Sequence, residues 1–135
     1  MKADSVIYPV VLSVDENDSV PYFVDVPDFG RSTQGNDLAD ALEMAKDLIS
    51  ILAIEYQDKG IALPVPSDTS DLAQNKGDIV TLVSANLTNY RLRQSNKAVR
   101  KNVTIPSWLA AEADAVHISY SSTLQEALRD KLGAA

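Results

Sequence analysis

Apolar and polar side chains alternate along much of the first 35 residues, a period typical of strands that bury one face. The segments YPVVLSVD (residues 8–15) and PYFVDVP (21–27) both place an apolar side chain at every second position. Between them, ENDS (16–19) favours a turn, because Asn and Asp bond to their own backbone and tolerate left-handed geometry. These segments predict a β-hairpin, to which RSTQ (31–34) could add a third short strand.

Apolar positions change to helical spacing between Asn36 and Gly60, which are a good N-cap and a good helix terminator. The apolar stripe consists of Leu38, Ala41, Leu42, Ala45, Leu48, Ile49, Leu52 and Tyr56. An amphipathic helix needs a sheet to cover, and the preceding strands supply it. DIVTLVSAN (78–86) is rich in β-branched residues and predicts a fourth strand. The fold class predicted for residues 1–86 is therefore α+β, a β-β-β-α-β module with its helix on one sheet face.

The remaining residues predict a linker and a second, much smaller module. Residues 87–96 are polar and basic without a firm period, so we expect a linker or hinge there. Residues 97–135 show an alternating strand that ends at Pro106, a helix from there to about Ala115, a break at HIS (117–119) and a second helix from about Ser119 to Leu132. One strand and two short helices bury little core alone. With no cysteine and one histidine, the remaining source of stability is oligomerisation.

Charge differs between the two parts, although the chain as a whole has a net charge of -7. Residues 1–86 hold 15 acids and 5 bases, whereas residues 87–135 hold 7 bases and 4 acids. Within residues 87–105 there is no acid, and the bases are Arg91, Arg93, Lys97, Arg100 and Lys101. Such asymmetry favours different partners for the two parts, one of them polyanionic. On charge alone, a solvated linker explains the basic segment equally well.

The composition is that of a globular protein, with 45% hydrophobic and 23% charged residues. The lack of cysteine excludes disulfides and thiolate metal sites and fits a reducing cytoplasm. The N-terminal segment predicts a strand rather than a signal peptide. No apolar stretch approaches the roughly 20 residues that cross a bilayer. We therefore expect a soluble, cytoplasmic protein that makes no membrane contact.

The C-terminal segment KAVRKNVTIPSWLAAEADAVHISYSSTLQEALRDKL (97–132) resembles a ribbon-helix-helix DNA-binding module. The shared pattern is an alternating strand that ends at a proline, a helix, a small turn, and a helix that opens at serine. The part ISYSSTLQEAL (118–128) is especially similar to the second helix of that family. The resemblance implies that two chains pair their strands into an antiparallel ribbon that binds operator DNA. It therefore implies a homodimer, and association into a higher oligomer stays open.

Residues 6–60 are similar to the antitoxin of HicAB toxin–antitoxin systems. The shared landmarks are the Tyr-Pro strand, the Pro-Asp after the second strand, the Thr-Gln-Gly and the helix that contains Ala-Leu. The sequence departs from the family at Ser19-Val20-Pro21, where a double glycine is usual, and at Phe29-Gly30-Arg31, where a longer Pro-Gly-Cys segment is usual. The resemblance implies a partial RNase H-like sheet. It also implies a small HicA-like ribonuclease toxin as partner, with a basic RNA-binding face.

In such a ribbon, alternate side chains face the major groove and the others face the core. The inward set is Val99, Val103 and Ile105, with Lys101 unusual among them. The outward set is Arg100, Asn102 and Thr104. Arginine can bond to guanine and asparagine to adenine, and threonine can contact either a base or the thymine methyl group. Lys97 and Lys101 suit phosphates, as do the free backbone N–H groups at Ser119 to Ser121. The alternative is an exposed edge strand whose polar residues only discourage aggregation.

An acidic module suits a basic protein partner, because its carboxylates attract that partner and compete with RNA, while aromatic side chains anchor the contact. The predicted toxin-binding residues are Tyr22, Phe23, Asp25, Asp28 and Phe29. Strand alternation requires at least one of the two adjacent aromatic residues, Tyr22 and Phe23, to lie in the core.

Enzymatic functions have little support in the sequence. His117, the single histidine, is expected to be a polar turn residue. The acids of the hairpin have neither a second carboxylate cluster nor a basic phosphate clamp beside them, and no glycine-rich phosphate loop is present. We expect neither catalysis nor a metal or other cofactor. The alternative to an antitoxin is a stand-alone ribbon-helix-helix transcription regulator whose acidic module senses a ligand or aids dimerisation. A neighbouring gene for a basic protein would separate the two.

Overall fold

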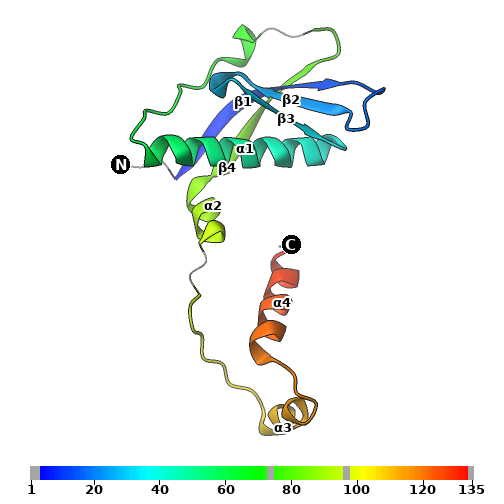
Figure 1. Cartoon of the computed structure of the whole chain (residues 1–135), viewed down its shortest axis with the longest axis vertical. Helices are drawn as coiled ribbons and strands as arrows, with labels where there is room; N and C mark the ends of the chain where they lie inside the picture. Colours follow the sequence, from blue (N-terminus) through cyan, green and yellow to red (C-terminus); the bar gives the residue numbers. More distant parts are fainter. Residues whose placement is uncertain (1–3, 73–74, 96–97, 134–135) are drawn as a thin grey trace. The chain divides into compact units, whose positions relative to one another are not determined.

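The strands of the N-terminal part form one antiparallel sheet in the computed structural model, which describes residues 4–72, 75–95 and 98–133 (Figure 1). Its strands are β1 (Ser5–Val14), β2 (Tyr22–Val26), β3 (Arg31–Gly35) and β4 (Ile79–Asn86). Their order in space is β3-β2-β1-β4, so β1 and β2 form the predicted hairpin and β4 pairs with β1. The α+β fold class is therefore confirmed. The chain divides into two units, residues 1–96 and residues 97–135.

Helix α1 (Leu38–Asp58) begins one residue later than predicted. Its N-cap is Asp37 and not Asn36, because the Asp37 carboxylate accepts from the Asp40 backbone N–H at 2.8 Å. The Asp40 carboxylate in turn accepts from the Asn36 N–H at 2.8 Å, so both acids satisfy donors at the helix start. The predicted terminator is correct. Gly60 adopts a left-handed φ of 70°, and the following N–H, of Ile61, donates to the Tyr56 carbonyl.

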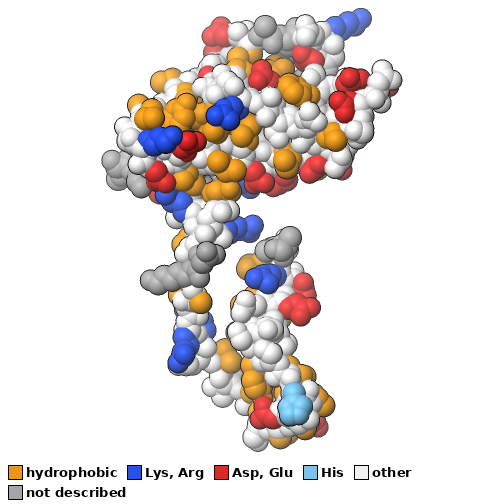
Figure 2. Space-filling model, viewed as in Figure 1, with side chains coloured by type: hydrophobic (Ala, Val, Ile, Leu, Met, Phe, Trp, Pro, Cys, Tyr) orange, Lys and Arg blue, Asp and Glu red, His pale blue; other side chains and the backbone are white. Residues whose placement is uncertain are grey.

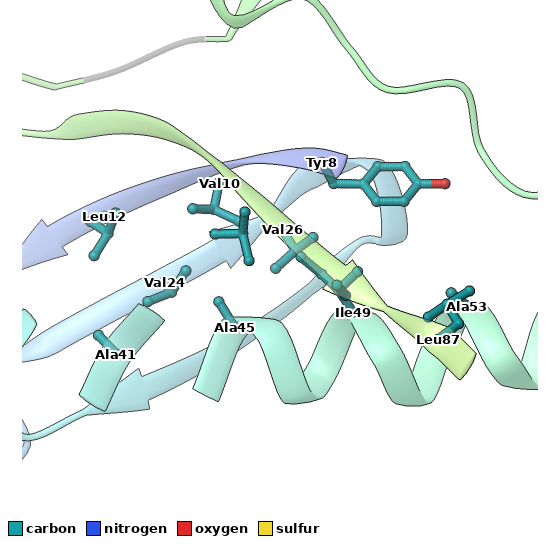
Figure 3. Close-up of a cluster of buried hydrophobic side chains, with 12 residues drawn as sticks. Tyr8, Val10, Leu12, Val24, Val26, Ala41, Ala45, Ile49, Ala53 and Leu87 are labelled. Atoms are coloured by element: carbon teal, nitrogen blue, oxygen red, sulfur yellow. The ribbon is translucent and has the colours of Figure 1, made fainter. Parts of the chain in front are cut away.

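The core lies between α1 and one face of the sheet (Figure 3). From the sheet it takes Tyr8, Val10, Leu12, Val24, Val26, Val83 and Ala85. The helix contributes side chains at intervals of four residues, which are Ala41, Ala45, Ile49 and Ala53, and all four are fully buried. This spacing keeps them on one helix face. Three of the four are alanines, so the helix backbone can approach the strands closely. Leu38, included in the predicted stripe, remains 44% exposed.

Residues 87–94, expected to belong to a linker, form the short helix α2 (Leu87–Gln94). Leu87 is buried, and its N–H donates to the Asp4 carbonyl at 2.7 Å. The Arg91 guanidinium forms an ion pair with Asp58 at 2.8 Å, at the C-terminal end of α1. Contacts with residues distant in sequence therefore hold α2 on the N-terminal unit. This explains why the apolar positions of residues 87–94 alone did not predict a helix.

The C-terminal unit contains α3 (Ser107–Ala115) and α4 (Tyr120–Leu132), close to the predicted ranges. Pro106 occupies the N-cap of α3 rather than its first helical position. His117 lies in the turn between the helices, as predicted, with a left-handed φ of 58°. Residues 98–106, the described part of the segment before α3, contain no helix or strand in the single chain (Figure 1). Among the described residues, no helix combines the length and hydrophobicity needed to cross a membrane.

Gly35, the last residue of the Thr-Gln-Gly at the end of β3, lies where a side chain would clash, and this can be tested. A Cβ added to Gly35 would lie 2.3 Å from the backbone N of Ala41 and 2.4 Å from its Cα. These atoms belong to α1 and cannot move aside alone, so we expect Gly35→Ala to lower the free energy of unfolding by about 1–3 kcal/mol. Urea denaturation of the full chain measures this change. The neighbouring Gln34→Ala, at an exposed position, should change it by less than about 0.5 kcal/mol. Equal stabilities for the two variants would contradict the steric explanation.

Candidate partner-binding surfaces

The outer face of the sheet, directed away from α1, brings two of the predicted toxin-binding residues together. Phe23 pairs with Ser13, and Asp25 pairs with Val11, at neighbouring outward positions of β1 and β2. Phe23 is 41% exposed, and Asp25 is half-buried. Tyr22 points to the opposite face, where it packs against the core. The strand period therefore divides the aromatic pair as expected, and Phe23 is the member that a partner can reach.

A hollow of about 370 Å³ lies on this outer face, between the strands and the connecting loop of residues 61–78. It is lined by Val11, Ser13, Phe23, Asp25, Pro27, Leu72, Asn75 and Asp78. Two carboxylates and an aromatic ring lie among these lining residues, and none of them is basic. This chemistry suits a cationic side chain, because a carboxylate can pair with it and the ring face can attract it. The sequence did not predict Asp78 and Leu72 as site residues. They lie beside Phe23 and Asp25 because the connecting loop folds back over the sheet, which a local pattern does not reveal.

Asp28, another predicted toxin-binding residue, attaches the connecting loop to the end of β2. Its carboxylate accepts from the Ser67 hydroxyl at 2.5 Å and from the Ser67 backbone N–H at 3.1 Å. Within the same loop, the Pro64 carbonyl accepts from the Tyr8 hydroxyl at 2.7 Å. Burial, with a smaller contribution from the nearby Asp28 charge, raises the pKa of Tyr8. Two points of attachment therefore define the path of this loop.

Phe29 occupies a packed position rather than an open surface. Its ring makes edge-to-face contacts with Tyr8, at 4.8 Å between centroids, and with Tyr56, at 5.4 Å. Such pairs stabilise a fold by about 0.5–1.5 kcal/mol beyond the burial of their area. Phe29 and Asp28 thus have structural partners of their own. Their contact with a toxin stays a prediction, and Phe23 is more exposed than either.

The C-terminal unit leaves its apolar side chains largely in solvent. The exposed large side chains are Val99, Val103, Ile105, Trp108, Leu109, Val116, Ile118, Tyr120, Leu124, Leu128 and Leu132. Of residues 98–133, only Ala110 and Ala113 are even half-buried. The Tyr120 hydroxyl of α4 donates hydrogen bonds toward α3, to the Asp114 carboxylate at 2.6 Å and to the Ala110 carbonyl at 3.1 Å. A chain with so much exposed apolar area needs another surface to cover it.

The predicted DNA-binding residues of the strand are fully accessible. Arg100, Lys101, Asn102 and Thr104 are all exposed in the segment before α3, whereas Lys97 lies outside the described residues. Figure 2 shows the side chains of both units coloured by type. At the start of α4, Ser119 is the N-cap, and its hydroxyl accepts from the Ser122 N–H at 3.3 Å. Ser121 is exposed in the first turn of the same helix. The backbone donors of this turn are thus placed where a phosphate can bind.

No group of metal-ligating side chains occurs among the residues that the structure describes. The acids of the β1–β2 turn instead bond to their own backbone: the Asp15 carboxylate accepts from Asn17 N–H at 3.1 Å, and the Asp18 carboxylate accepts from Val20 N–H at 3.0 Å. These are ordinary turn contacts. Asp15 and Asp18 therefore have a structural role in the turn of the hairpin.

Residues 8–129 match the family model of the HicB-like antitoxins of bacterial toxin–antitoxin systems. This range covers most of both units, and the chain belongs to that family. The resemblance found in the sequence is therefore confirmed at the level of the family.

Solved structures agree with this assignment. A chain of a toxin–antitoxin complex from Streptococcus pneumoniae is 26% identical, with a TM-score of 0.59, over 94% of this chain and 99% of that chain. The antitoxin HicB of Burkholderia pseudomallei is 25% identical, with a TM-score of 0.52, over 94% of this chain and 98% of that one. No curated protein sequence matches the chain.

The attachment of the connecting loop gives a prediction that does not depend on any partner. Ser67→Ala removes the hydroxyl that bonds to Asp28, and we expect it to lower the free energy of unfolding by about 0.5–1.5 kcal/mol. It should also speed cleavage within the loop during limited proteolysis, because the loop opens more often. Ser70→Ala is the matched control, since that hydroxyl bonds only to Asp68 within the same loop. Equal cleavage rates in the two variants would show that the Ser67 hydroxyl does not hold the loop.

Proposed function

We propose that this chain is an antitoxin that binds and neutralises a small, basic ribonuclease toxin of the HicA type, and that it represses its own operon by binding operator DNA. The observation that carries this proposal is the family match over residues 8–129, because that range includes the acidic unit as well as the basic segment and helices that follow it. The similarity to a chain of a toxin–antitoxin complex supports the toxin as partner.

The N-terminal unit is the part that binds the toxin. Its excess of carboxylates attracts a basic RNA-binding face and repels RNA from the same place. Phe23 supplies an exposed aromatic anchor, and Asp25 and Asp78 lie beside it in the hollow of the outer face. A contact of this kind, with an aromatic centre and charges around it, is typical of binding hot spots. Inhibition then results from covering the toxin and requires no catalytic group in the antitoxin.

The C-terminal unit binds DNA as a homodimer. Two copies pair the segment before α3 into a ribbon, and this pairing covers the apolar side chains that one chain leaves in solvent. Val99, Val103 and Ile105 then face the shared core. Arg100, Asn102 and Thr104 face the major groove, whose base edges they can bond to. The N-terminal turn of α4 lies near phosphate.

Co-purification with the product of the neighbouring gene tests the proposal as a whole. A stable complex with a basic protein, whose ribonuclease activity disappears on binding, is the expected result. A chain that binds operator DNA but neither binds nor inhibits that protein would instead be the stand-alone regulator, with its acidic unit serving a ligand or dimerisation.

Phe23→Ala is expected to weaken toxin binding by about 10-fold or more, because truncating a central aromatic anchor typically costs over 1 kcal/mol. Isothermal titration of the full-length antitoxin with toxin measures this affinity. Thermal unfolding should change little, since the ring is 41% exposed. Met44→Ala is the control, because Met44 has the same exposed fraction but lies on α1. Equal affinities for the two variants would exclude the outer face as the centre of the contact.

Asn102→Ala is expected to weaken specific operator binding by about 1–3 kcal/mol and to relax the preference at one base pair. Lys97→Ala should weaken operator and unrelated DNA alike and reduce the salt slope by about one unit. Fluorescence anisotropy with both DNAs over a salt series separates these effects. If Asn102 proves essential for folding while Lys101 and Val103 determine specificity, the two faces of the strand are exchanged.

A further inference from the structure

The hydroxyl of Tyr120, the first residue of α4, reaches back across the interhelical turn to α3. It donates to the Asp114 carboxylate at 2.6 Å and lies 3.1 Å from the Ala110 carbonyl oxygen. These two acceptors belong to residues four positions apart, so they lie on the same face of α3. A single hydroxyl thus joins the start of α4 to the C-terminal half of α3.

Little else fixes the start of α4 in the single chain. The two half-buried residues within 98–133 are alanines, which offer only small side chains for packing. The backbone bonds of the turn close the end of α3: the His117 N–H donates to the Asp114 carbonyl at 3.2 Å, and the Ile118 N–H donates to the Ala113 carbonyl at 3.0 Å. Among the residues that the structure describes, side-chain hydrogen bonds between the two helices come from Tyr120 alone.

Asp114 stands where a carboxylate is unfavourable for two reasons. It lies in the last turn of α3, near the negative end of the helix dipole. It also belongs to the basic part of the chain, residues 87–135, where it repels any polyanion that approaches. A residue that opposes both local patterns is expected where a specific contact compensates, and the Tyr120 hydroxyl supplies that contact.

The contact acts on the residue with which α4 begins. The first N–H groups of a helix have no acceptor within it. In α4 the Ser122 N–H donates to the Ser119 hydroxyl at 3.3 Å, and the Thr123 N–H donates to the Ser119 carbonyl at 3.1 Å. The N–H groups of Tyr120 and Ser121 precede these, at the positive end of the helix dipole. The Tyr120 hydroxyl therefore restrains the backbone that carries these donors.

We propose that Tyr120 is a positioning residue for DNA binding: through its bond to Asp114 it fixes the first turn of α4 against α3, so that the N–H groups of this turn are held ready for a phosphate. The inference rests on the proposed binding of DNA by the tail. It concerns the DNA backbone, whereas base recognition belongs to the segment before α3. A donor that is already held in place loses less conformational entropy on binding than a donor on a freely moving helix.

Tyr120→Phe removes the hydroxyl and keeps the ring. In full-length protein, we expect it to weaken binding to operator and unrelated DNA by the same factor, about 3- to 10-fold, because a phosphate contact carries no base preference. The salt slope should fall by about one unit for each bound tail. Fluorescence anisotropy with both DNAs over a salt series measures the two effects. Tyr90→Phe, the same deletion on α2, is the control and should change neither.

Replacement of Asp114 separates positioning from charge. Asp114→Asn and Asp114→Ala remove the same negative charge, but only asparagine keeps an oxygen that can accept from Tyr120. We expect Asp114→Asn to bind both DNAs at least as tightly as the natural chain, and Asp114→Ala to bind about 3- to 10-fold more weakly than Asp114→Asn. Charge alone predicts equal affinities, and helix stability alone favours alanine, the better helix former. In the Tyr120→Phe background the difference should disappear.

The inference is overturned if Tyr120→Phe keeps the natural affinity and salt slope, or if Asp114→Ala binds as tightly as Asp114→Asn. A loss restricted to operator DNA would also overturn it, because the hydroxyl would then act on base recognition. So would a lower particle mass of Tyr120→Phe in light scattering, which would assign the hydroxyl to assembly. A natural chain that binds neither DNA would contradict the proposed function of the tail itself, and the inference would fall with it.

Discussion

The close contact of α1 with a single face of the sheet determines which surfaces remain for partners. Gly35 and the alanines at positions 41, 45 and 53 let the helix backbone approach the strands, so one helix closes the core. On the opposite face, described residues of the connecting loop line a hollow, and β4 is an edge strand of the sheet. The outer face with Phe23 and Asp25, and the edge of β4, are therefore the parts of the sheet that α1 does not cover.

Most of the N-terminal fold follows from local patterns. Alternation from Tyr8 to Val26 predicted the hairpin, and Gly60 marked the end of α1 correctly. The helix start was misplaced by one residue, because two adjacent side chains suit an N-cap and the choice depends on Asp40. Helix α2 was missed altogether. Its stability comes from contacts with Asp4 and Asp58, which no local window contains.

The candidate sites, like the fold, could be predicted only where a local pattern determines the position of a side chain. Alternation correctly divided Tyr22 from Phe23, because it is a property of the strand itself. It could not show that Asp28 holds the connecting loop, since its partner Ser67 lies 39 residues away. For the tail, the sequence predicted both helices, but pairing of the preceding segment requires atoms of a second chain. Its inward and outward faces therefore stay predictions.

The ion pair between Arg91 and Asp58 also determines where the N-terminal unit ends. Because α2 is held against the C-terminal end of α1, residues 87–94 belong to the fold of this unit rather than to a flexible connection. A fragment that stopped at residue 86 would therefore lose the buried Leu87 and the contact of α2 with α1.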